Sequence, residues 1–176
     1  MAGGELLAET RPNYAGLYAP GYGGSVSYGF SNVVSLQVKV WQALYRFDGE
    51  TRGGGSGSAI VMLNDSTAST RLAVIPTFAM LFSGGSDDGH GASLLIAAWL
   101  PSWGVLHPYV ALGPAAGWVN LSHLDGYGLI GNIGAAFTIT HSFTLTFELA
   151  GVLGFDVTDD LTSVAATPKV SLGWLF

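Results

Sequence analysis

The stretch SVAATPKVSLGWLF, residues Ser163 to Phe176, decides the fold. Every second residue from Val164 to Phe176 is apolar, while the positions from Ser163 to Gly173 that alternate with them are small or polar. A period of two is the period of a β-strand, so this stretch predicts one strand with an apolar face and a small or polar face.

The composition of the chain favours a protein that spans a membrane with strands. Charged residues make up only 10% of the 176 residues, against about 25% in a typical soluble domain. No stretch approaches the roughly 20 apolar residues of a spanning helix, and the 26 glycines interrupt every candidate. Lipid offers no partner to backbone N–H and C=O groups, so a closed barrel is the remaining way to span. We therefore predict a single transmembrane β-barrel domain over residues 1–176.

Alternating stretches recur through the chain and are separated by turns. The other predicted strands are 23–30, 33–47, 58–63, 70–82, 93–100, 107–119, 127–139 and 143–155. Together with 163–176 they number nine, whereas bacterial single-chain barrels have even strand counts. We therefore add residues 4–11 and predict an all-β fold: a closed, antiparallel, up-and-down transmembrane barrel, preferably of ten strands. Eight strands are the alternative, in which 58–63 is a loop and the N-terminal stretch is coil.

Three motifs resemble the small bacterial outer-membrane barrel superfamily that includes the OmpA-type and OmpW-type domains. They are the run His107–Gly113 after a turn, the Gly-rich run Gly128–Ala136 before a turn, and the terminal Gly173–Phe176. The resemblance implies location in the bacterial outer membrane, long outer loops, and contact with outer-membrane lipid and lipopolysaccharide. It also implies recognition of Phe176 by the barrel-insertion machinery. It does not imply an activity, because this superfamily includes anchors, adhesins, solute channels and a few lipid-modifying enzymes.

The alternation predicts which side chains line the barrel interior. An ionised side chain facing lipid costs about 2–4 kcal/mol at mid-membrane, so charged residues of the strands are expected to face inward. Glu148 and Lys169 lie on adjacent predicted strands, where they form either an internal salt bridge or a charged constriction that tunes ion passage. The predicted pore-lining residues are Lys39, Arg71, Trp99, Asn132, Glu148 and Lys169.

Small residues on the predicted inner face, such as Gly113, Gly134 and Ala150, favour an unfilled interior. Side chains just fill an eight-stranded barrel, so ten strands lined by small residues predict a narrow pore for small solutes, apolar ones among them. The alternatives are that large residues fill the gaps, and that the protein is a non-conducting anchor, adhesion or structural scaffold. No catalytic arrangement stands out, so we predict neither enzymatic activity nor a cofactor. The net charge of −6 disfavours nucleic-acid binding, and we expect a monomer.

The predicted outer loops collect acidic residues. Asp87, Asp88, His90 and Asp125 would supply oxygen and imidazole ligands to a divalent ion if their loops meet in space. The alternative is that these are solvated loop charges without a ligand.

Two stretches suggest engineering or processing. Residues Gly53–Ser58 have the composition of a flexible linker and fall where an outer loop is expected, so they are either a natural loop or an engineered replacement. Residues Met1–Glu5 lack the basic and apolar regions of a signal peptide, which suggests a mature form with an added start Met.

Overall fold

The computed structural model describes residues 2–12, 18–47, 50–65, 67–83, 89–119, 123–156 and 162–175. Within these ranges no helix is long and apolar enough to cross a membrane, and the chain forms ten strands. The strands are β1 (Ala2–Pro12), β2 (Tyr18–Gly29), β3 (Val34–Phe47), β4 (Glu50–Met62), β5 (Arg71–Ser83), β6 (Gly89–Trp99), β7 (Leu106–Val119), β8 (His123–Thr140), β9 (Phe143–Asp156) and β10 (Thr162–Leu175). The predicted all-β, antiparallel, up-and-down fold is confirmed.

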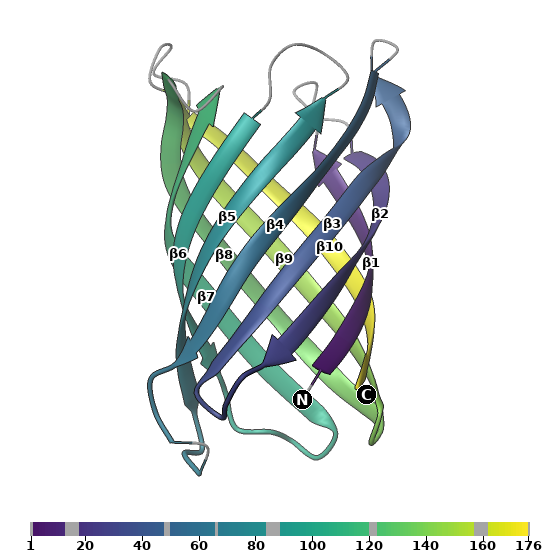
Figure 1. Ribbon diagram of the computed structural model, residues 1–176, viewed down its shortest axis with the longest axis vertical. Coiled ribbons are helices and arrows are strands. Elements are labelled where there is room, and N and C mark those ends of the chain that lie inside the picture. The colour runs from purple at the N-terminus through teal and green to yellow at the C-terminus, as the bar shows by residue number, and fades with distance from the viewer. Residues whose placement is uncertain are drawn as a thin grey trace.

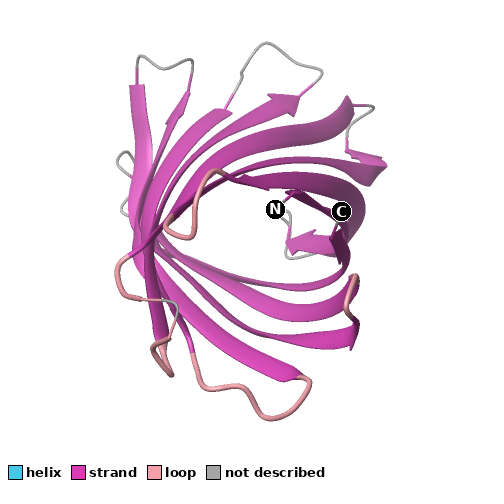
Figure 2. Cartoon of the chain, turned by 60° about the horizontal axis from the view of Figure 1, so that its bottom comes forward, coloured by secondary structure: helices cyan, strands magenta, loops and turns pink. Residues whose placement is uncertain are grey.

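The strands surround one axis in chain order (Figure 1). Each strand pairs antiparallel with the next, and β1 pairs with β10 from Gly3 and Leu175 to Glu9 and Lys169, so the described strands form a closed barrel. Figure 2 shows the strands as a single wall around the axis, and the two termini lie at the same end (Figure 1). Because every strand has two neighbours, the ring leaves no free sheet edge.

The two faces of the wall follow the strand period. In β10, Val164 is 78% exposed, whereas Ser171 is 4% exposed. In β3, the exposed Val38 and Val40 flank the half-buried Lys39. Large apolar side chains therefore cover the outside, and small, polar or charged side chains face inward, as the alternation predicts.

One segment differs from its prediction. Gly53–Ser58, expected to be a flexible outer loop, lies inside β4 and pairs with both neighbouring strands. Gly55 lies between Val40 of β3 and Met80 of β5, and Gly57 lies between Val38 and Phe78. The partner strands supply the hydrogen bonds and the apolar side chains, so a glycine-rich segment is held as a strand without side chains of its own.

The connections also differ from expectation. At the end that holds the termini they are residues 30–33, 63–70, 100–105 and 141–142. At the other end the strands are separated by 13–17, 48–49, 84–88, 120–122 and 157–161, which lie outside the described residues, as does Phe176. The resemblance implied long outer loops, yet these connections are no longer than those at the opposite end.

Candidate functional site in the barrel lumen

One row of register partners crosses six strands on the inner face, and we call it the inner row. It runs through directly paired residues from β5 to β10: Arg71, Trp99, Tyr109, Gly134, Glu148 and Lys169. Partners in register point to the same face of a sheet. The inner row therefore brings together four of the six predicted pore-lining residues.

A charged pair, Glu148 on β9 and Lys169 on β10, lies at the end of the inner row. The Lys169 ammonium Nζ lies 3.2 Å from Oε1 of Glu148, and the two side chains are only 16% and 17% exposed. The Tyr109 hydroxyl donates a hydrogen bond of 2.5 Å to the other carboxylate oxygen, Oε2. Both oxygens of Glu148 are thus engaged, and the predicted internal salt bridge is present, with a third partner from β7.

The glycine in the inner row makes room for Tyr109. A Cβ added at Gly134 would lie 2.6 Å from both Cζ and the hydroxyl oxygen of Tyr109. The phenol ring therefore lies across Gly134 on its way from β7 to Glu148 on β9. The indole of Trp99 follows on β6, with ring centroids 6.5 Å apart and ring planes inclined by 32°. Trp99 and Tyr109 thus form one aromatic surface that ends at the charged pair.

A second group on the inner face is apolar, and we call it the apolar inner cluster. Ala73, Ala97 and Ala111 form the register row next to the inner row, and they are 0%, 1% and 5% exposed. The buried core of the cluster is Leu95, Ala97 and Ala111, against which Ile75, Trp99 and Ile130 pack. Trp99 thus contacts this cluster as well as Tyr109.

The remaining predicted pore-lining residues also occupy inward positions. Asn132 pairs with Ala111 and Ala150, beside the inner row. Lys39 pairs with Ser25 and Ser56 on a different part of the wall, across β2 to β4. At the start of the inner row, Nε of Arg71 is buried and has no hydrogen-bond partner in the described part of the chain.

Sequence reasoning missed Tyr109 as a functional residue. The inward position of Tyr109 follows from the same alternation that places Gly113 on the inner face, so the sequence alone predicts that position. The contact with Glu148 depends on the register of β7, β8 and β9, and on a glycine in the middle strand. That register cannot be read from the alternation of one strand.

The structure does not assemble the predicted metal site. His90 and Asp125 were expected in outer loops, but they lie within β6 and β8, and Asp87 and Asp88 fall outside the described residues. His90 occupies an outward register position and packs against Phe78, with ring centroids 6.2 Å apart. Among the described residues, no three metal-binding side chains come together. The metal site therefore stays a prediction.

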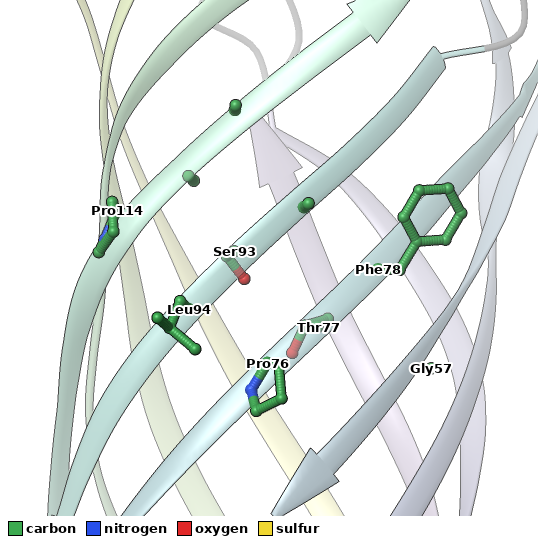
Figure 3. A pocket seen from close by; sticks show the side chains of 10 residues that line it. Gly57, Pro76, Thr77, Phe78, Ser93, Leu94 and Pro114 are labelled. Carbon is green, nitrogen blue, oxygen red and sulfur yellow. The ribbon is translucent and has the colours of Figure 1, made fainter. Parts of the chain in front are cut away.

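The outer wall carries a shallow apolar groove across β4 to β7, with a volume of about 550 Å³ (Figure 3). Register pairing is interrupted at Pro76 on its β4 side and at Pro114 on its β6 side, because proline has no N–H to donate. Phe78 and Leu94 in its lining are exposed on the outward face. The groove is therefore a feature of the outer surface, separate from the inner row.

Comparison with known proteins supports the fold alone. No protein-family model matches the chain, and no curated protein matches it in sequence. A bacterial polysaccharide outer membrane secretin aligns with a TM-score of 0.54 at 9% identity, over 98% of this chain and 65% of the secretin, so this chain spans about two thirds of that protein's length. The KdgM porin aligns with a TM-score of 0.51 at 15% identity, over 99% of both chains. The chain therefore has the fold of the bacterial outer-membrane β-barrels.

Proposed function

We propose that the chain is an integral protein of the bacterial outer membrane, crossing it as a closed barrel of ten strands. The outward face supports this proposal, because Val26, Ile96 and Ile133 are each more than 60% exposed. Apolar exposure over a whole wall marks a surface that meets lipid or another protein. Outer-membrane lipid and lipopolysaccharide would then be its surroundings, and the insertion machinery would act through Phe176.

Exposed aromatic residues near both ends of the wall support the same placement. Tyr28, Phe30 and Phe143 lie toward the end with the termini, whereas Tyr127 and Phe155 lie toward the other end. Aromatic girdles at both lipid–water interfaces are typical of membrane barrels.

We further propose that the barrel is a narrow pore for small solutes and has no catalytic role. This proposal rests on how little of the inner face is buried. Among the large side chains of the described residues, Leu95 alone is buried, at 8% exposure, and the charged pair retains partial exposure. A filled interior packs its large side chains out of contact with water, so this inner face is better suited to a hydrated passage. The porin among the structural neighbours has the same fold.

The charges of the inner face set the expected ion preference. Lys39, Arg71 and Lys169 are the cations at inward positions, and Lys169 is paired with Glu148. β1 places Glu9 in register with Lys169 and Glu5 in register with Ser25, so two acidic positions belong to the same face of the wall. We therefore expect a small conductance with weak selectivity.

Recordings in planar bilayers with a salt gradient test the pore directly. The Lys39→Glu variant should move the reversal potential toward cation selectivity, because rings of fixed charge select counter-ions. Lys39→Arg is the matched control and should leave the reversal potential where it is. Liposome swelling with small sugars gives a second readout. Silent bilayers from protein that shows the heat-dependent gel shift of a folded barrel would remove the pore proposal.

A non-conducting anchor or scaffold is the second candidate, and the apolar inner cluster favours it. Ala73, Ala97 and Ala111 are almost fully covered from the inside, so side chains narrow the interior along β5 to β8. The bilayer recordings separate the two candidates, since a scaffold would fold, insert and remain silent.

A further inference from the structure

The start of the inner row has the elements of a small binding site. Arg71 and Trp99 are direct register partners on β5 and β6, and side chains in that relation lie about 5 Å apart at Cβ. The row next to them consists of Ala73, Ala97 and Ala111, which are covered. Trp99 packs against this alanine row, yet it remains only partly buried. Part of the Trp99 side chain is therefore left uncovered on the inner face.

The guanidinium beside this ring has unused hydrogen-bonding capacity. Nε of Arg71 is buried without a hydrogen-bond partner in the described part of the chain, whereas native proteins pair nearly all such groups. The other inner-row cation, Lys169, differs because Glu148 balances it. Planar guanidinium groups bind carboxylates through two parallel N–H bonds. An anionic acceptor next to Trp99 would therefore complete the hydrogen bonding of this guanidinium.

We propose that Arg71 and Trp99 form a site for a small solute that carries a carboxylate on a ring. The carboxylate accepts hydrogen bonds from Arg71, and the ring lies on the indole of Trp99. A flat aromatic ring and the C–H face of a sugar ring both suit an aromatic surface. Beyond the ring, the Tyr109 hydroxyl and the charged pair offer acceptors and donors to further polar groups of the solute. This inference rests on the proposed function, because it places the site along the proposed passage.

Equilibrium binding to the folded barrel in detergent micelles tests the site without requiring conduction. Four probes, measured by isothermal titration calorimetry, separate its parts: benzoate and glucuronate have a ring and a carboxylate, glucose has only a ring, and acetate has only a carboxylate. We expect at least one ring acid to bind about tenfold more tightly than glucose, since a charge-assisted hydrogen bond is worth about that factor. The same ring acid should also bind more tightly than acetate, because only the ring acid contacts the indole of Trp99. Tighter binding of benzoate indicates an aromatic acid, and tighter binding of glucuronate indicates a sugar acid.

Variants of the folded barrel assign the two contacts. Arg71→Gln should weaken binding of the ring acid about tenfold and leave binding of glucose unchanged. Arg71→Lys should recover only part of the lost affinity, because an ammonium cannot donate two parallel N–H bonds to one carboxylate. Trp99→Leu should weaken binding of both the ring acid and glucose. Lys39→Gln is the matched control, as it removes an equal charge elsewhere on the inner face. Equal binding of ring acid and acetate, equal losses in Lys39→Gln and Arg71→Gln, or no binding of either ring acid would overturn the site. A silent bilayer with intact binding would remove only the pore.

Discussion

The apolar inner cluster and the Glu148–Lys169 pair occupy the same face of the same wall, yet their surroundings are opposite. Along β5 to β8, Ala97 is 1% exposed among aliphatic neighbours. On β9 and β10, the charged side chains keep 16–17% exposure and contact each other, and Glu148 also accepts a hydrogen bond from Tyr109. The two regions meet where Trp99 lies next to Tyr109.

This difference shows what the inner face of a barrel requires. The alternation keeps charge away from lipid, but it does not require the interior to be polar. A buried charge is stable only where partners satisfy it, and Glu148 has two partners, Lys169 and Tyr109. The buried core of the apolar inner cluster, Leu95, Ala97 and Ala111, has no polar side chain. A charge that points inward among these three residues is therefore destabilising.

The sharpest test of the comparison introduces the same carboxylate into each region. Leu95→Asp places a charge opposite Ile75, away from Arg71, and should lower the free energy of unfolding by about 3 kcal/mol or more relative to Leu95→Asn. Ala150→Asp is the control, because Ala150 is half-buried, pairs with Asn132 and lies near Lys169. This variant should lower the free energy of unfolding by less than about 1 kcal/mol. Urea unfolding in phospholipid vesicles, followed by tryptophan fluorescence, measures both. Equal losses would mean that the two regions are hydrated alike.

The parts of this comparison that the sequence predicts are those that depend on the strand period. The cost of charge in lipid turns Glu148, Lys169 and Lys39 inward, and the short turn around His141 makes β8 and β9 neighbours. The parts it does not predict depend on register between strands. The contact of Tyr109 with Glu148 needs Gly134 between them, and the strand at Gly53–Ser58 is held by its partners. Neither composition nor the period of a single segment contains that information.

The second test removes one member of the charged pair at a time. Glu148→Gln removes the carboxylate that Lys169 contacts, and Lys169→Met removes the ammonium but keeps the hydrogen bond from Tyr109. Each should cost about 1–3 kcal/mol, below the 3–5 kcal/mol of a fully dry pair, because the side chains keep some contact with water. The double variant should lose less than the sum of the two. Strict additivity in urea unfolding would show that the two residues do not interact.

The smallest effect is expected from a single methyl group placed where the two regions join. Gly134→Ala puts Cβ 2.6 Å from the Tyr109 ring and 2.7 Å from the backbone oxygen of Phe147. The ring must move away from Glu148, and we expect the free energy of unfolding to fall by about 1–2 kcal/mol.

Gly57→Ala is the control, because a Cβ there has no atom within 4 Å. It should be neutral or stabilising by up to about 1 kcal/mol, since alanine restricts the unfolded chain more than glycine. Both variants are compared with the parent by urea unfolding in vesicles. If they prove equally stable, the ring of Tyr109 does not lie across Gly134, and the aromatic surface that connects the two regions is absent.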